Sequence, residues 1–355
     1  MFGQPHHYPF RRALAEMEPY VPGEQPQGGK FVKLNTNENP YPAAQAVVEA
    51  ICSAATTGLE RYPDPYANAF RNRAAEVLGL PGPDWIMAGN GSDEILTILV
   101  RALVGEGQRL RMPYPSYILY ATLADIQGAL WERLEFDKNW RLPAAFADGC
   151  DDLRLVFLPN PNSPSGTVEP PEKVLQLAEQ LPCPLVIDEA YADFAEANCL
   201  SLVQQNENIF VTRSLSKSYA LAGLRFGFVV AQPHRIAELM KIKDSYNCDT
   251  LSIAAATAAV GSTQWLQENV ARIRATRTRM EARLKQLGFR VTPSQANFVW
   301  CEHHESSHKQ IYQTLKRQQI LVRYMNFPAW GDGLRISVGT DQQVDACMLL
   351  LEQCV

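Results

Sequence analysis

The segment Ser214-Leu215-Ser216-Lys217-Ser218-Tyr219-Ala220-Leu221-Ala222-Gly223-Leu224-Arg225-Phe226-Gly227 sets one lysine among hydroxyl side chains and one arginine further along the chain. Arginine presents a planar fork of donors that matches phosphate oxygens, and the hydroxyls of Ser214 and Ser216 can add hydrogen bonds. A lysine near another cation loses its proton more readily, and the neutral amine attacks carbonyl groups to form a Schiff base. The segment therefore suits a ligand that carries a carbonyl group and a phosphate, as pyridoxal phosphate does.

Ser214-x-x-Lys217 also allows two other interpretations. The lysine could be an ordinary surface side chain beside a helix of small residues. The same spacing also occurs in serine acyl-transferases of the penicillin-binding type, but no Lys-Thr-Gly follows here, and Ser92-Asp93-Glu94 is not the Ser-Asp-Asn of those enzymes. The longer pattern through Arg225 and Gly227 favours the site for a phosphorylated carbonyl compound.

The composition is that of an ordinary globular protein. The chain has 355 residues, of which 46% are hydrophobic and 20% are charged, and its formal net charge is -5. This charge gives no general attraction to nucleic acid or to anionic membranes. We found no apolar run of membrane-spanning length, no signal peptide and no C-x-x-C pair, and we therefore expect a cytoplasmic protein. The spacing in His303-His304-Glu305-Ser306-Ser307-His308 lacks the H-E-x-x-H order, so we expect no metal.

The order of predicted elements indicates two domains and an arm. Residues 1–30 are rich in Pro, Gly and polar residues and are predicted to form an extended arm. Short apolar runs then alternate with helical stretches, which is typical of a mostly parallel sheet flanked by helices. We place this large domain at residues 31–245, and a smaller α+β domain at residues 246–355. In such sheets, ligands bind beyond the carboxyl ends of the strands.

An acidic residue stands at one of those strand ends. Asp188 follows the apolar run Pro184-Leu185-Val186-Ile187, and Tyr191 comes three residues later. A pyridine ring accepts electrons well only when its nitrogen is protonated, and an adjacent aspartate keeps it protonated. Alternatively, an aspartate at this position could simply cap a following helix.

Together these segments resemble the fold-type I pyridoxal-phosphate enzymes, in their aminotransferase form. The resemblance implies that Lys217 carries the cofactor, that Asp188 contacts the ring nitrogen, and that Tyr191 contacts the phenolic oxygen. It also implies that Ser214, Ser216 and Arg225 bind the phosphate. The turn Gly89-Asn90-Gly91-Ser92-Asp93 would add the backbone amides of Gly91, Ser92 and Asp93, as the N-terminus of a helix does for anions.

Three further positions follow from the same resemblance. Tyr117 matches the aromatic residue that stacks on the ring, although it could be a core tyrosine instead. The turn Asn160-Pro161-Asn162-Ser163-Pro164-Ser165-Gly166 has serine where the family has the asparagine that donates to the phenolic oxygen. Ser163, or Asn162 through a shifted turn, is expected to replace it. Tyr62, in Arg61-Tyr62-Pro63-Asp64-Pro65, matches a tyrosine that reaches the neighbouring subunit of a homodimer.

Within that group, the chain resembles the histidinol-phosphate aminotransferases over nearly its whole length. The matching segments are Pro19 to Gly23, Lys33 to Pro40, Arg61 to Pro65, Asn160 to Gly166, Ser214 to Gly227, Ala296 to Val299 and Leu334 to Thr340. The resemblance implies transfer of an amino group from L-histidinol phosphate to 2-oxoglutarate, in histidine biosynthesis. Arg335 and Arg323 would grip the anionic end of the substrate, with Asn37 also in the substrate site. Aromatic aminotransferases and decarboxylases of phosphorylated amino acids share most of these motifs and remain alternatives.

Overall fold

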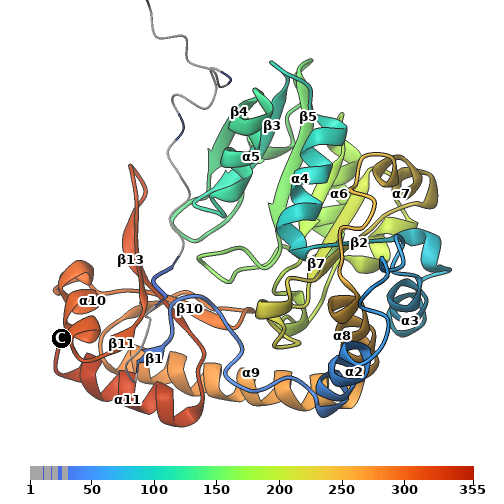
Figure 1. The fold of residues 1–355 in the computed structure, drawn as a ribbon. Coiled ribbons are helices and arrows are strands. Elements are labelled where there is room, and N and C mark those ends of the chain that lie inside the picture. Colours follow the sequence, from blue (N-terminus) through green and yellow to red (C-terminus); the bar gives the residue numbers. More distant parts are fainter. Residues whose placement is uncertain (1–10, 12–16, 18–22, 26–30) are drawn as a thin grey trace, which may run out of the picture.

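The computed structural model describes residues 11, 17, 23–25 and 31–355 of the chain. The predicted arm over residues 1–30 therefore lies almost entirely outside the described residues. Figure 1 shows a large α/β part and, beside it, a smaller part built mainly from the C-terminal third of the chain. The long helix α9 (Thr263–Gln286) runs beneath both parts.

The large part is organised around a seven-stranded sheet with the order β2-β8-β7-β6-β5-β3-β4. Strand β8 runs antiparallel to its two neighbours, and the other adjacent pairs are parallel. This confirms the predicted mostly parallel sheet. The strands are β2 (Ile86–Gly89), β3 (Arg109–Tyr114), β4 (Leu130–Glu135), β5 (Leu153–Pro159), β6 (Leu185–Asp188), β7 (Ile209–Ser214) and β8 (Gly227–Val230).

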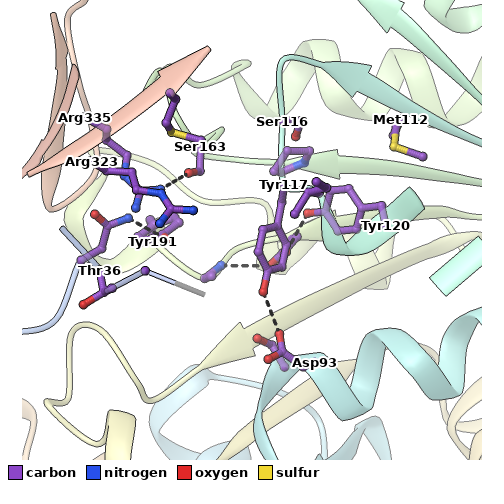
Figure 2. Close-up of a pocket in the computed structure, with 18 of the residues that line it drawn as sticks. Thr36, Asp93, Met112, Ser116, Tyr117, Tyr120, Ser163, Tyr191, Arg323 and Arg335 are labelled. Atoms are coloured by element: carbon purple, nitrogen blue, oxygen red, sulfur yellow. Dashed lines mark hydrogen bonds between the residues drawn. The ribbon is translucent and has the colours of Figure 1, made fainter. Parts of the chain in front are cut away.

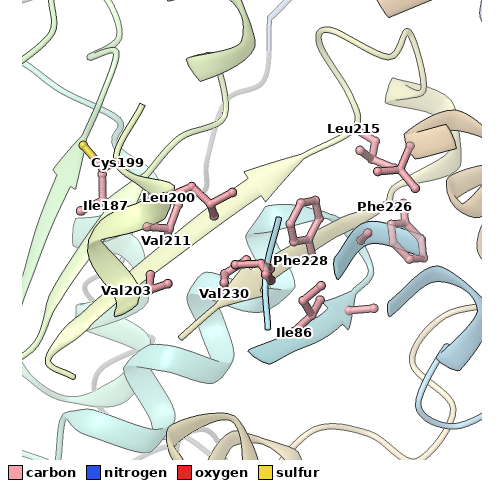
Figure 3. Packing of buried hydrophobic residues seen from close by; sticks show 14 of the residues in the cluster. Ile86, Ile187, Cys199, Leu200, Val203, Val211, Leu215, Phe226, Phe228 and Val230 are labelled. Carbon is pink, nitrogen blue, oxygen red and sulfur yellow. The ribbon is translucent and has the colours of Figure 1, made fainter. Parts of the chain in front are cut away.

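Helices cover both faces of this sheet, because successive side chains of a strand point to opposite faces. On β6, Val186 packs in the cluster formed with one set of helices, α4 (Gly91–Leu103), α5 (Leu119–Gln127) and α7 (Pro233–Met240). Leu185 and Ile187 instead pack in the cluster shared with the second set, α2 (Gln45–Ala55), α3 (Asn68–Leu78), α6 (Pro171–Gln180) and α8 (Thr250–Gly261). Figure 3 shows part of this second cluster, including Ile187, Val211 and Phe228.

The smaller part contains a four-stranded antiparallel sheet with the order β12-β13-β10-β9. Its elements are β9 (Arg290–Val291), β10 (Phe298–Glu302), α10 (His308–Arg317), β11 (Ile320–Leu321), β12 (Arg323–Phe327), β13 (Gly331–Ser337) and α11 (Asp341–Glu352). The short strand β1 (Val32–Lys33) pairs in parallel with β11. Residues that we assigned to the large domain thus contact the C-terminal part, and the domain boundaries stay a prediction.

The arginines of α9 serve mainly to hold neighbouring segments together. Arg279 pairs with Asp341 at 2.9 Å, and Arg283 pairs with Glu352 at 2.8 Å, which joins α9 to α11. Arg277 donates to the backbone oxygen of Ala296. Part of this helix face is thus used in ion pairs and carbonyl contacts.

The eight cysteines are unpaired thiols. Over the part of the chain that the structure describes, no helix is long and apolar enough to span a bilayer. The same part contains no group of three or more His, Cys, Asp or Glu side chains arranged to hold a metal ion. His308 instead faces Asp332 at 3.2 Å and accepts a hydrogen bond from the backbone of His303.

Candidate active site

A cavity of about 940 Å³ lies at the carboxyl ends of the central strands, between the two parts of the molecule. This is the position expected for a ligand site in an open α/β sheet. Its lining includes predicted site residues from both parts, namely Asn37, Ser92, Asp93, Tyr117, Ser163, Asp188, Tyr191, Ser214, Ser216, Lys217, Arg225, Arg323 and Arg335. The fold therefore brings most of the predicted site together.

Lys217 lies in the loop after β7, and its amine points into the cavity. Its Nζ donates to the backbone oxygen of Thr36 at 3.2 Å and lies 6.0 Å from the ring centre of Tyr191. The amide of Asn39 donates to the backbone oxygens of Lys217 and Ser218, at 2.9 and 3.1 Å. The loop is thus fixed from the side of the N-terminal segment, with the amine of Lys217 in the cavity.

A buried charge network holds the same loop from behind. Arg213 pairs with Glu189 and with Asp193, each at 2.8 Å, and Asp193 accepts a hydrogen bond from the hydroxyl of Ser218. Three network members, Arg213, Glu189 and Ser218, are sequence neighbours of Ser214, Asp188 and Lys217, which line the cavity. This network was not predicted from the sequence.

The predicted phosphate end consists of Arg225, Ser216 and the first turn of α4. Arg225 has a left-handed backbone (φ 50°), and its guanidinium lies 3.1 Å from Asp93 and 3.5 Å from the Ser216 hydroxyl. The helix α4 begins at Gly91, where the unpaired N–H groups of a helix attract anions. A Cβ at Gly227 would lie 2.5 Å from the Ser92 nitrogen, so a glycine is required for α4 to approach β8 this closely.

Asp188 ends β6 and is buried, 5% exposed. It accepts hydrogen bonds from Tyr120 at 2.7 Å, from Thr212 at 3.2 Å and from the backbone of Ala190 at 3.2 Å. Burial raises the pKa of the Asp188 carboxyl, and these hydrogen bonds oppose that change. Among the described side chains no cation pairs with Asp188, so a positive ring nitrogen on a ligand would supply the opposite charge that we expected.

Two aromatic rings border the space above Asp188. Tyr117 donates to Asp93 at 3.2 Å and meets Tyr120 edge to face, with ring centres 5.6 Å apart (Figure 2). Burial and the adjacent Asp188 raise the pKa of Tyr120 well above its ordinary value, which keeps its hydroxyl protonated as a donor. The placement of Tyr117 beside the predicted phosphate end agrees with a ring-stacking role, which stays a prediction.

The two candidate donors in the turn after β5, Asn162 and Ser163, have different hydrogen-bond partners. Asn162 is 2% exposed, accepts from Ser116 at 3.0 Å and donates to Ser165 at 2.9 Å, so its amide is engaged within the turn region. Ser163 faces the cavity, where its hydroxyl accepts a hydrogen bond from Arg335 at 3.0 Å (Figure 2). Ser163, which we expected to take the place of an asparagine, thus contacts Arg335.

Arg323 and Arg335 lie on adjacent strands of the smaller sheet and both line the cavity. Arg335 also donates to the backbone oxygen of Asn35 at 3.0 Å. Two guanidinium groups side by side form a site for an anion with several oxygens.

The sequence did not indicate how deeply two of the predicted site residues, Asn37 and Tyr62, are buried. Asn37 is buried behind Tyr191 and donates to its hydroxyl at 3.0 Å. Tyr62 is 80% exposed and stacks on Tyr246, with ring centres 4.4 Å apart, outside the cavity lining.

The sequence analysis did not identify Tyr120 and Thr212, although the position of each relative to a predicted site residue could have indicated it. Tyr120 follows Tyr117 by three residues, in the first turn of α5, and the two rings are in contact. Thr212 is the register partner of Asp188 and lies two residues before Ser214, on the same face of β7.

Pyridoxal phosphate fits these side chains. The cavity offers an amine at Lys217, a buried carboxylate at Asp188 for a ring nitrogen, and donors at Ser216, Arg225 and the start of α4 for a phosphate. The aldehyde, the ring nitrogen and the phosphate of the cofactor each have a matching group among the described residues.

Comparison with known proteins agrees with this geometry. The profile of the family "Aminotransferase class I and II" matches residues 29–348. The chain is 66% identical to a histidinol-phosphate aminotransferase of Rhodopirellula baltica, over 98% of this chain and 96% of that protein. It is 44% identical to histidinol-phosphate aminotransferase 1 of Trichormus variabilis, over 94% of this chain and 95% of that protein.

A solved structure extends the comparison to three dimensions. The histidinol-phosphate aminotransferase of Sinorhizobium meliloti, solved in complex with pyridoxal-5'-phosphate, superposes with a TM-score of 0.88 at 25% identity. The match covers 98% of this chain and 97% of that one. The chain belongs to the class I and II aminotransferases and, within them, to the histidinol-phosphate aminotransferase family. This assignment leaves the serine acyl-transferase interpretation of Ser214-x-x-Lys217 without support.

Proposed function

We propose that this protein transfers the amino group of L-histidinol phosphate to 2-oxoglutarate, giving imidazole acetol phosphate and glutamate in histidine biosynthesis. The observation that carries the proposal is the pair Arg323 and Arg335, which lines the same cavity as Lys217 and Asp188. An anion-binding pair, a reactive amine and a buried carboxylate are the groups that this reaction requires. The names of the relatives in Rhodopirellula baltica and Trichormus variabilis support the same substrate.

The cofactor in this proposal is pyridoxal 5'-phosphate. When bound, it supplies an aldehyde that links to amines and a ring that withdraws electrons from the substrate's α-carbon. Lys217 would hold the aldehyde, and Asp188 would keep the ring nitrogen protonated. Arg225, Ser214, Ser216 and the amides of Gly91 to Asp93 would hold the phosphate.

Lys217 has a second role, in proton transfer. Once the substrate amine has replaced it, its Nζ is a free base within the cavity and can take the proton from the substrate's α-carbon. The backbone oxygen of Thr36, 3.2 Å from Nζ, keeps the amine on this side of the cavity. Asp188 stays ionised opposite the positive ring nitrogen, because an opposite charge lowers a carboxyl pKa.

The arginine pair explains how one site accepts two substrates. Histidinol phosphate presents a phosphate and 2-oxoglutarate presents a carboxylate, and a guanidinium fork pairs with either group. Phenylalanine or tyrosine would place no anion against one of the two guanidinium groups, which disfavours its binding. This disfavours the aromatic aminotransferase alternative. The decarboxylase alternative shares the cofactor site but predicts release of carbon dioxide.

We also propose that the enzyme is a cytoplasmic homodimer. Tyr62 and Tyr246 form an exposed aromatic pair, and large exposed apolar patches often mark interfaces. Tyr62 would reach the cofactor phosphate of the neighbouring subunit, which makes the complete site a property of the dimer.

The proposal is tested by comparing substrates at fixed 2-oxoglutarate, with glutamate formation as the readout. Histidinol phosphate is expected to have the highest kcat/KM, with phenylalanine at least about 10-fold lower. O-phosphothreonine should release no carbon dioxide. A higher kcat/KM for phenylalanine would contradict the substrate assignment and leave the aminotransferase chemistry intact.

A further inference from the structure

Asn37 is a buried residue with every polar group of its side chain and backbone in use. It is 1% exposed and has a left-handed backbone, with φ 55°. Its backbone oxygen accepts from the amide of Asn297 at 3.0 Å, and its side-chain nitrogen donates to the Tyr191 hydroxyl at 3.0 Å. The remaining two contacts are with Ser337, on the same strand as Arg335.

Ser337 fixes the orientation of the Asn37 amide. The backbone N–H of Asn37 donates to the Ser337 hydroxyl at 2.8 Å, so this hydroxyl acts there as an acceptor. Its own proton is then donated to the side-chain oxygen of Asn37, 2.9 Å away. The amide oxygen must therefore face Ser337, and the amide NH₂ must face Tyr191.

The direction of the amide determines how Tyr191 can bond. Because the Tyr191 oxygen accepts a hydrogen bond from Asn37, its own O–H must donate a hydrogen bond to another acceptor. Among the described residues no acceptor takes that proton. Tyr191 lines the cavity beside Lys217, so the free direction leads into the cavity.

We propose that Asn37, held by Ser337, is a positioning residue that directs the Tyr191 hydroxyl proton toward the phenolic oxygen of the bound cofactor. The inference rests on the proposed function, since it needs pyridoxal phosphate linked to Lys217. It replaces the direct substrate contact that we expected for Asn37. It also supplies the donor that the family's asparagine would provide, because Ser163 faces Arg335 here.

A donor on the phenolic oxygen has a measurable consequence. When the nitrogen that joins Lys217 to the cofactor is protonated, it shares its proton with this oxygen. When that nitrogen is deprotonated, the oxygen's negative charge depends on an external donor. Tyr191 therefore stabilises the deprotonated form and lowers the pH at which the absorbance of the linked cofactor changes.

The test is a pH titration of the absorbance of cofactor-loaded wild type, Asn37→Gly, Tyr191→Phe and the double variant. Glycine tolerates the positive φ and leaves the charge unchanged. We expect Asn37→Gly to raise the midpoint by roughly 0.5 to 1 pH unit, as loss of one hydrogen bond would. Tyr191→Phe should raise it at least as much, and the double variant should match Tyr191→Phe.

An unchanged midpoint in Asn37→Gly, or a double variant whose change is the sum of the two single changes, would overturn the inference. Ser337→Ala provides an independent test if Asn37→Gly does not fold. It frees the amide to turn over and should also raise the midpoint. Lys217→Ala separates this inference from the proposed function. Lys217→Ala should lack the absorbance of the linked cofactor. If wild type also lacks this absorbance, the cofactor assignment fails. If wild type shows it, a negative titration result overturns only the role of Asn37.

Discussion

Arg323 and Arg335 are direct register partners on β12 and β13, so two cations face one another at the cavity. Like charges in directly opposed positions destabilise a sheet. An anion bound between the two side chains would offset this repulsion. The pair therefore marks the position at which the phosphate or carboxylate of the substrate is expected to bind.

Replacing the two arginines separately should give different results. Arg335→Ala is expected to lower kcat/KM for both histidinol phosphate and 2-oxoglutarate, by roughly 10- to 100-fold, because both anions use this fork. Arg323→Ala should affect the phosphate substrate more, since a doubly charged group can engage both forks. The measurement is the kcat/KM of each half-reaction. Equal losses for the two substrates in Arg323→Ala would contradict this division of roles.

The close approach of α4 to β8 can be tested with a matched pair of glycine variants. Gly227→Ala places a Cβ 2.5 Å from the Ser92 nitrogen and 2.9 Å from the backbone oxygen of Arg213. We expect it to weaken cofactor binding and to lower the free energy of unfolding by about 1–3 kcal/mol. Gly223→Ala, in the short 3₁₀ helix Ala222–Leu224 just before Arg225, meets nothing within 4 Å and is the control. Equal cofactor affinities in both variants would exclude the proposed phosphate end.

Asp188→Asn should raise the stability of the apoprotein and lower the turnover of the enzyme. Burial raises the pKa of Asp188 in the folded apoprotein, so ionisation of this carboxyl costs more free energy in the folded than in the unfolded chain. The protonated carboxyl therefore contributes stability at low pH, and this contribution is lost as pH rises through the folded-state pKa. The variant is therefore expected to stabilise the apoprotein at pH 7. The gain should disappear at pH values below the ordinary aspartate range.

The same variant should still bind the cofactor but lose turnover by on the order of 100-fold. Denaturant unfolding of the apoprotein at several pH values checks the first effect, and half-reaction rates check the second. Near-normal half-reaction rates would refute the electron-sink role of Asp188.

The proposed dimer predicts complementation between two inactive subunits. Tyr62→Phe and Lys217→Ala each damage a different contribution to the site, one from the neighbouring subunit and one from the subunit itself. Hybrid dimers formed by mixing the two variants should regain one intact site each. Activity and sedimentation of the mixture are the measurements. A fully active monomer would rule out the cross-subunit role of Tyr62.

The central part of the fold was predictable because its signals are local. Apolar runs at Leu155 to Leu158 and at Leu185 to Ile187 are buried on both faces, as parallel strands are. The segment around Lys217 also carried its chemistry within one short stretch. These predictions required no knowledge of which residues meet across the fold.

The remaining features depend on contacts between distant segments. The alternation along β12 is weak, with Arg323 to Asn326 only partly buried or exposed, and this strand was not predicted. Asn37 lies 300 residues from Ser337 along the chain, and their contact requires the N-terminal segment to lie against the smaller part, as the pairing of β1 with β11 shows. The hydrogen bonds of Asn162 and Ser163 differ for the same reason: Asn162 bonds to Ser165 within the turn, whereas Ser163 bonds to Arg335 of the smaller sheet.

The most direct test of the central claim follows one half-reaction on the purified, cofactor-loaded enzyme. Histidinol phosphate is added without 2-oxoglutarate, and the cofactor absorbance is recorded in wild type and in Lys217→Ala. We expect wild type to convert its cofactor to the amine form with release of the keto product, faster than with phenylalanine, and Lys217→Ala to show no such conversion. Conversion at wild-type rate in Lys217→Ala, or none in wild type, would contradict the account.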